Sequence, residues 1–127
     1  MRYFVTSSKD ATIYNKQDTL NTGRDQILEV KKLQITGSAD ISRALIYFDL
    51  TAESQSIAAN ALTEPTLSLQ LSETETKYLS ASGSINIHVI SSQWDEGTGK
   101  VIYDPIVTDG VSWTYTDQVN GNEWNTA

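Results

Sequence analysis

The side chains in this sequence with the greatest potential for chemistry are four carboxylates. Asp10 and Asp18 lie near the N-terminus, and Asp95 and Glu96 are neighbours far along the chain. Ca²⁺ prefers oxygen ligands, which loops often supply. The four residues do not have the spacing of a known calcium motif such as an EF-hand loop. If the protein holds a metal, we expect it to be calcium, with these four residues as the candidate ligands.

Catalysis has little support in the sequence. His88 is the only histidine, and a lone histidine is a poor metal site and a poor general base without an adjacent nucleophile. Glycoside hydrolysis needs two carboxylates that flank a sugar, whereas the side chains of consecutive residues such as Asp95 and Glu96 tend to diverge. The absence of cysteine excludes thiol nucleophiles, thiolate metal sites and disulfides. We expect a protein that is not an enzyme.

Tryptophan rings offer a different chemistry, because exposed aromatic rings stack on sugars. Trp113 is in phase with Val111 and Tyr115 and is expected in the core. Trp94 opens a turn, and packing at one end of the fold is the simpler interpretation of it. Trp124 has polar neighbours on both sides. The candidate ligand-binding residues are Trp124 and Trp94, together with Asn86 and His88, for which an ordinary solvated strand face is the competing interpretation.

Most of the elements that must position these candidate residues are predicted to be β-strands. Apolar and polar residues alternate over residues 66–72, 85–89 and 111–116, which is typical of strands with one buried face. A denser apolar run over residues 43–50 predicts a central strand. Shorter strand candidates are residues 3–6, 11–14, 27–31 and 101–103. Frequent turns between seven to nine short strands favour an all-β fold, an antiparallel β-sandwich of jelly-roll type, with one short helix as an option within residues 51–62.

Length and charge narrow the function classes. A chain of 127 residues is the size of a single domain, and we expect residues 1–127 to form one. Nine basic and sixteen acidic residues give a net charge of −7, which disfavours nucleic acid and anionic membranes as partners. No stretch is apolar enough to insert into a membrane. Arg24, Lys31, Lys32 and Lys100 are too dispersed in sequence to predict a basic face.

Several segments, taken in order, resemble the DNRLRE-type β-sandwich modules, which are allied to carbohydrate-binding modules. The resemblance runs from about Ser8 to the C-terminus. An opening strand carries Asp10-Ala11, the turn Asn21-Thr22-Gly23 follows, and residues 42–50 contain an Arg-Ala-Leu run that ends in Phe-Asp-Leu. The later segments are Ile87-His88-Val89, Trp94-Asp95-Glu96-Gly97, Gly110-Val111-Ser112-Trp113 and Trp124-Asn125-Thr126-Ala127.

The resemblance implies a non-catalytic accessory module of extracellular enzymes, surface proteins or phage virion proteins. Some members of the family bind polysaccharide, and others are structural or adhesive. Tyr47 stands where the family often has a basic residue, so a role for that charge does not carry over. Members usually continue past Asn-Thr-Ala into a final strand, so we expect residues 1–127 to be the N-terminal part of a longer protein or another segment to pair at this edge.

Two functions remain as expectations. The first is a structural or adhesive module of a phage particle, located in the virion, with other virion subunits or the rest of a longer chain as partners in an oligomeric assembly. The N-terminal residues lack the pattern of a secretory signal, which favours this interpretation. The alternative is an extracellular carbohydrate-binding module that recognises polysaccharide.

Overall fold

The computed structural model describes residues 4–59, 66, 68–69 and 84–125. The chain divides into two compact units, one made of Met1–Asp49 and Ser91–Ala127 and the other of Leu50–Ile90. Each unit is described by itself. The strand predicted at residues 66–72 falls largely outside the described residues, and the expectation of a single domain stays a prediction.

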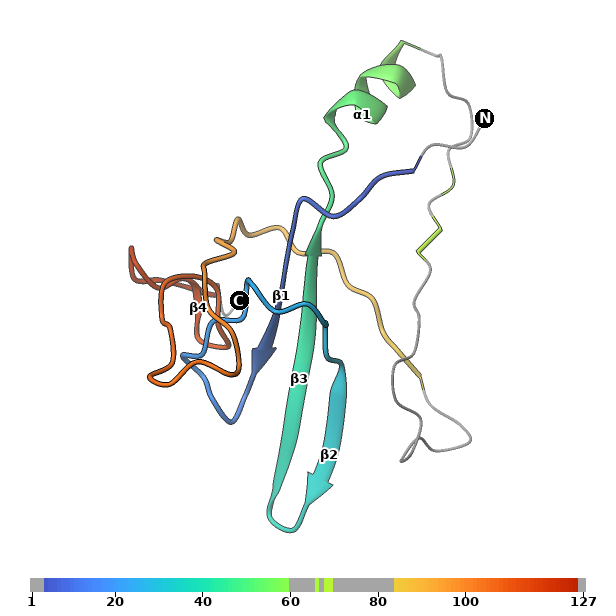
Figure 1. Ribbon diagram of the computed structural model, residues 1–127. Coiled ribbons are helices and arrows are strands. Elements are labelled where there is room, and N and C mark those ends of the chain that lie inside the picture. The colour runs from blue at the N-terminus through green and yellow to red at the C-terminus, as the bar shows by residue number, and fades with distance from the viewer. Residues whose placement is uncertain (1–3, 60–65, 67, 70–83, 126–127) are drawn as a thin grey trace. The chain divides into compact units, whose positions relative to one another are not determined.

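The main sheet has three antiparallel strands in the order β1-β3-β2 (Figure 1). They are β1 (Lys9–Tyr14), β2 (Lys31–Ile35) and β3 (Ser38–Tyr47). Ala11 pairs with Leu45 on one side of β3, and Leu33 pairs with Asp40 on the other. The predicted strand at residues 11–14 and the predicted central strand are therefore confirmed, although β3 ends at Tyr47 rather than at Leu50.

A tight hairpin joins β2 to β3. Ile35 pairs with Ser38 across the two residues Thr36 and Gly37, and Gly37 has a φ of 88°. Only glycine adopts this left-handed conformation without steric cost, so its position sets the register of the hairpin. The strand predicted at residues 27–31 is wrong except for Lys31, where β2 begins.

The core of this unit is small and partly aromatic. Ala11 and Ile13 from β1 and Leu45 from β3 pack with Trp94 and Val111, all of them buried. Trp113 and Trp124 are partly buried against this cluster. The prediction that Trp113 belongs to the core is confirmed to the extent that its side chain packs against the core and is partly buried.

A second, two-stranded sheet is formed by β4 (Tyr115–Asp117) and β5 (Asn122–Glu123). The strand predicted at residues 111–116 is wrong over residues 111–114 and right only where β4 begins, at Tyr115. Ser112 N–H donates to the Tyr115 carbonyl at 2.9 Å, and Ser112 Oγ accepts from Tyr115 N–H at 3.2 Å. These bonds close a turn over residues 112–115, which breaks the alternation that the sequence displays.

The Leu50–Ile90 unit contains helix α1 (Thr51–Ala58), which confirms the helical option within residues 51–62. Residues 84–90 have no strand, so the prediction of a strand at residues 85–89 is wrong for this structure. Val89 is 98% exposed. Alternation makes a strand only where a neighbouring strand pairs with its N–H and C=O groups.

The fold is thus strand-rich with one short helix, and its described residues contain five strands in two small sheets. Residues 4–6 and 101–103, both predicted as strands, have none. At residues 100–103 a turn replaces the strand, because Tyr103 N–H donates to the Lys100 carbonyl at 3.1 Å. Within the described ranges no helix is long and apolar enough to cross a membrane.

Candidate functional site

A buried asparagine organises the loops around the main sheet. Asn21 is fully buried, and its Nδ2 donates to the Glu96 and Val111 carbonyls at 2.8 and 2.9 Å. Its Oδ1 accepts from the N–H groups of Gly99 at 2.8 Å and Gly23 at 3.2 Å. The amide therefore uses both donors and both lone pairs of its oxygen. One side chain joins three segments that are far apart in the sequence.

Glycine is required where these segments meet Asn21. A Cβ on Gly97 would lie 2.5 Å from Asn21 Oδ1, and Gly97 also has a φ of +73°. A Cβ on Gly99 would lie 2.2 Å from the Asn21 carbonyl oxygen. Both approaches are shorter than real side chains make, so the Gly97-Thr98-Gly99 sequence gives the loop its close contact with residue 21.

Two of the four candidate calcium ligands meet at β1. Glu96 Oε1 accepts from the backbone N–H of Asp10 at 2.8 Å, and Asp10 Oδ2 accepts from Ser7 Oγ at 3.1 Å. Asp95 Oδ1 instead accepts from Gly97 N–H in its own turn at 3.4 Å, and Asp18 is exposed. In the described part of the chain, no three His, Cys, Asp or Glu side chains gather as a metal site. Calcium binding stays a prediction.

Trp94 lies in the core. It is 7% exposed, and Lys9 Nζ lies 4.5 Å from the centre of its ring while bonding to its carbonyl oxygen. The ring is therefore covered by the protein itself, and the suggestion that it stacks on sugar does not fit this structure. Packing at the end of the fold, the simpler interpretation, accounts for it.

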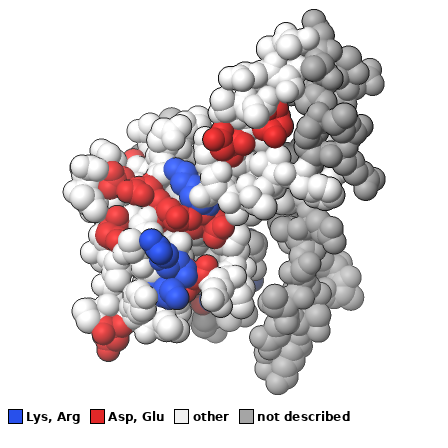
Figure 2. All heavy atoms as spheres, turned by 45° about the horizontal axis from the view of Figure 1, so that its top comes forward, with Lys and Arg blue, Asp and Glu red and all other residues white. Residues whose placement is uncertain are grey.

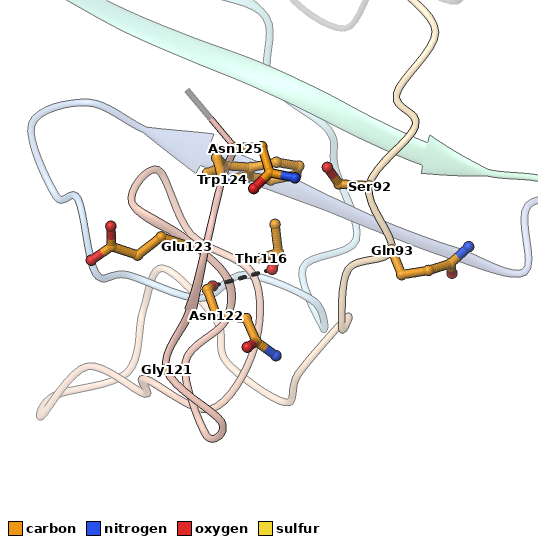
Figure 3. A pocket seen from close by; sticks show the side chains of 8 residues that line it. All are labelled: Ser92, Gln93, Thr116, Gly121, Asn122, Glu123, Trp124 and Asn125. Carbon is orange, nitrogen blue, oxygen red and sulfur yellow. Dashed lines mark hydrogen bonds between the residues drawn. The ribbon is translucent and has the colours of Figure 1, made fainter. Parts of the chain in front are cut away.

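Trp124 lines an open hollow of about 960 Å³ (Figure 3). Its Nε1 donates to the Ser112 carbonyl at 2.9 Å, which fixes the indole, and Thr116 Oγ1 donates to the Asn122 carbonyl at 3.1 Å. Polar side chains make up most of the lining, and the residues are Ser92, Gln93, Thr116, Gly121, Asn122, Glu123, Trp124 and Asn125. An indole edge beside amides and hydroxyls suits a neutral, hydroxyl-rich ligand.

The other two candidate ligand residues, Asn86 and His88, are not among the residues that line this hollow. Both are exposed and belong to the Leu50–Ile90 unit. Sequence reasoning missed Ser92 and Gln93, because no spacing connects them to the C-terminal residues. The polar neighbours of Trp124 did indicate this site in the sequence, since Asn122, Glu123 and Asn125 all line the hollow.

Comparison of the chain with protein-family models, with curated proteins and with solved structures gives no match. The resemblance to DNRLRE-type modules therefore stays a prediction carried by the segments quoted above.

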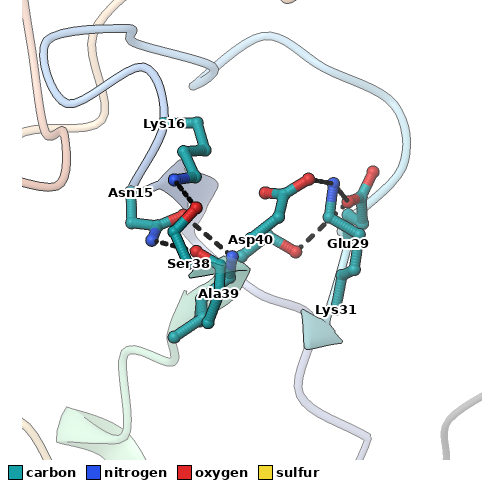
Figure 4. Close-up of polar contacts among 9 residues, drawn as sticks. Asn15, Lys16, Glu29, Lys31, Ser38, Ala39 and Asp40 are labelled. Carbon is teal, nitrogen blue, oxygen red and sulfur yellow. Dashed lines mark hydrogen bonds and ion pairs between the residues drawn. The ribbon is translucent and has the colours of Figure 1, made fainter. Parts of the chain in front are cut away.

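Charged groups elsewhere on the main sheet act structurally. Lys31 Nζ lies 3.0 Å from Asp40 Oδ2 and 3.2 Å from Glu29 Oε1 (Figure 4). Hydrogen bonding to Asp40, and then to Glu29, raises the pKa of Lys31 above its usual value. Burial raises the pKa of Tyr14, and the nearby charges of Glu29 and Asp25 add to this. Neither group is placed in the hollow beside Trp124.

Proposed function

We propose that the protein is a non-catalytic structural or adhesive module of a phage particle that docks onto neighbouring virion subunits. The observation that carries this proposal is an exposed apolar loop at residues 101–106. The loop presents Val101, Ile102, Tyr103 and Ile106 to solvent, with Ile102 82% exposed. Apolar side chains grouped on a surface mark sites of protein association, because burying them removes their contact with water.

The loop is held in place by the protein. Val101 N–H donates to Asp25 Oδ2 at 3.2 Å, and Tyr103 N–H donates to the Lys100 carbonyl at 3.1 Å. A loop that is fixed before binding loses less conformational freedom when a partner covers it. This favours docking over the view that these apolar side chains are a chance feature of the surface.

The proposed fold of the complete module is an antiparallel jelly-roll β-sandwich with seven to nine strands. The five strands of the described residues would be part of it, and the alternating segment at residues 66–72 is proposed as a further strand. The resemblance to DNRLRE-type modules supports this architecture. A cryo-EM map of the parent particle would test it by showing whether residues 66–72 lie in a sheet with the five strands.

Docking is tested by substitution in the parent virus. Ile102→Ser removes the most exposed side chain of the loop, and we expect it to reduce incorporation of the protein into purified particles. Val119→Ser is the matched control, because Val119 is also strongly exposed but lies in the turn between β4 and β5. Equal incorporation of the two variants and the natural protein would contradict docking through this loop.

A second candidate function is recognition of neutral polysaccharide, which would place the module outside the cell or on the particle surface. The observation that favours it is the fixed Trp124 indole beside Gln93, Asn122 and Asn125 in one hollow. Calorimetric titration with neutral oligosaccharides tests it. We expect heat from at least one sugar, and weaker binding by Gln93→Ala and Asn125→Ala. Flat heats at millimolar sugar across the panel would remove this candidate.

A further inference from the structure

Two basic residues that are distant in sequence line one cavity on the main unit. The cavity measures about 450 Å³ and is lined by Arg24, Thr98, Lys100, Tyr103 and Val107. Its volume falls in the range of roughly 300–1,000 Å³ that is typical of small-molecule sites. It shares no residue with the hollow beside Trp124.

The Asn21 network brings the two basic residues together. Asn21 Oδ1 accepts from Gly99 N–H, and Arg24 N–H donates to the Gly99 carbonyl at 2.9 Å. Lys100 directly follows Gly99, and the side chains of both Arg24 and Lys100 line the cavity. Val101 N–H bonds Asp25 Oδ2 just beyond, which fixes the loops on the other side. The fold therefore fixes the backbone that carries Arg24 and Lys100. The side chains of Arg24, Thr98 and Tyr103 are exposed, so the cavity is open to solvent.

Neither cation is neutralised within the described residues. The ion pairs found there belong to Lys31, and no hydrogen bond is made there by the side chain of Arg24 or Lys100. The chain as a whole carries a net charge of −7, and the face drawn in Figure 2 has more acidic than basic surface. Arg24 is exposed and Lys100 partly buried, so both are open to a ligand, and two cations that line one cavity favour a ligand with negative charge.

Nearby carboxylates limit how much negative charge the ligand can carry. Asp109 accepts from both the N–H and the Oγ1 of Thr98, and Asp25 accepts from Val101 N–H. Asp109 thus contacts the lining residue Thr98, and Asp25 directly follows Arg24 in the chain, so a run of phosphates such as nucleic acid would be repelled. A ligand with a single anionic group could bind Arg24 and Lys100 without bringing further negative charge close to Asp25 and Asp109.

We infer that this cavity binds one acidic sugar residue of a polysaccharide, through its carboxylate or sulfate group. Arg24 offers a planar guanidinium that matches an oxyanion in two hydrogen bonds, and Lys100 offers a second charge. Tyr103 supplies a ring for stacking and Val107 an apolar wall, which a simple surface ion pair would not need. The inference goes beyond docking and does not require the Trp124 hollow to act as proposed. Tyr103 belongs both to the cavity and to the apolar loop, so the free protein is the form in which sugar binding is tested.

Calorimetric titration with three matched probes tests the inference: an oligogalacturonate, its methyl-esterified neutral form, and a sulfated oligosaccharide. We expect at least one of the two acidic probes to bind and the neutral form to bind at least about tenfold more weakly. The double variant Arg24→Gln/Lys100→Gln should lose about tenfold or more in affinity for that probe. Comparison of the two acidic probes distinguishes carboxylate from sulfate as the preferred group.

The control is Lys16→Gln/Lys32→Gln, which changes the net charge by the same amount on exposed residues outside the cavity. It should bind as tightly as the natural chain. Absence of binding to both acidic probes would overturn the inference, as would equal binding of the neutral form. An equal loss in the control variant, or equal binding of an acidic peptide, would show general charge attraction instead and would also overturn it. Loss of neutral-sugar binding at Trp124 would leave these results unchanged.

Discussion

The Asn21 side chain is buried in the position where a small protein would usually place an apolar group. Its four hydrogen bonds reach residues 23, 96, 99 and 111. A buried polar network that is fully satisfied stabilises one arrangement, because each alternative arrangement would leave some of these groups unpaired in a low dielectric. The turn Asn21-Thr22-Gly23 thus matters through its asparagine side chain as well as through its backbone.

Asn21→Ala is expected to destabilise the protein by about 3 kcal/mol or more. The substitution leaves the buried Gly99 N–H and Val111 carbonyl without their partner, and also the partly buried Gly23 N–H and Glu96 carbonyl. Each buried loss costs roughly 1–3 kcal/mol, and water compensates part of the other two. Asn125→Ala, at an exposed position, should change the free energy of unfolding by less than about 0.5 kcal/mol. Urea unfolding followed by tryptophan fluorescence measures both. Equal midpoints for the two variants would show that Asn21 does not hold the loops together.

At the scale of elements, the outer edge of β1 is covered by side chains instead of by another strand. Thr22 Oγ1 accepts from Thr12 N–H at 2.8 Å and donates to the Thr12 carbonyl at 2.7 Å. Glu96 covers the next outward N–H of the same edge, at Asp10. Unpaired strand edges attract other strands, and this arrangement protects β1 from such pairing.

Thr22→Val tests this edge with almost no change in shape. The valine cannot replace either hydrogen bond, so Thr12 keeps a buried N–H and a buried carbonyl without partners. We expect a loss of about 2–4 kcal/mol and faster hydrogen exchange at the Thr12 amide. Thr22→Ser keeps the hydroxyl and should retain slow exchange. If exchange at Thr12 is equally slow in the valine variant, the side chain is not what protects the edge.

The turn between β4 and β5 should respond to acid. Asp117 accepts from the Asn120 side chain and, at 3.1 Å, from the Asn120 N–H, and these bonds lower the pKa of Asp117 below its ordinary value of 3.8. A lowered folded pKa means that this stabilisation is fully present above the unfolded value and is lost as the pH falls through the folded one.

We therefore expect the Asn120 amide resonance to shift only as the pH falls below 3.8, the ordinary value for aspartate, because the Asn120 hydrogen bonds lower the pKa of Asp117 in the folded protein. NMR spectra recorded across this range make the measurement. Asp117→Asn removes the titrating group, and its turn resonances should stay constant over the same range. An identical titration in this variant would assign the change to another carboxylate.

At the scale of the whole molecule, the hydrophobic pattern of the sequence predicted part of the secondary structure correctly. Strands β1 and β3 and helix α1 overlap the segments predicted from their own residue types, whereas residues 85–89 alternate as clearly and form no strand. Contacts between distant residues decided the rest. The turn at residues 112–115 depends on the Ser112 hydroxyl, and the burial of Trp94 depends on its packing against β1 and Lys9. Arg24 and Lys100 looked dispersed in sequence because their loops meet only through tertiary hydrogen bonds, those of Asn21 among them.

Net charge and exposed apolar surface act against each other in this molecule. The charge of −7 makes copies of the chain repel one another at neutral pH, while the apolar loop at residues 101–106 favours association. Salt screens the repulsion, and a pH near the isoelectric point of about 4.5 removes it.

Self-association should therefore rise with ionic strength at pH 7 and rise further as the pH approaches 4.5. Sedimentation velocity at several protein concentrations measures it. Ile102→Ser should weaken association under both conditions, because the loop then offers less apolar area. Val119→Ser removes a comparable exposed side chain elsewhere and should have little effect. If both variants associate as the natural chain does, the apolar loop does not drive contact between copies, and the surface that does must lie outside it.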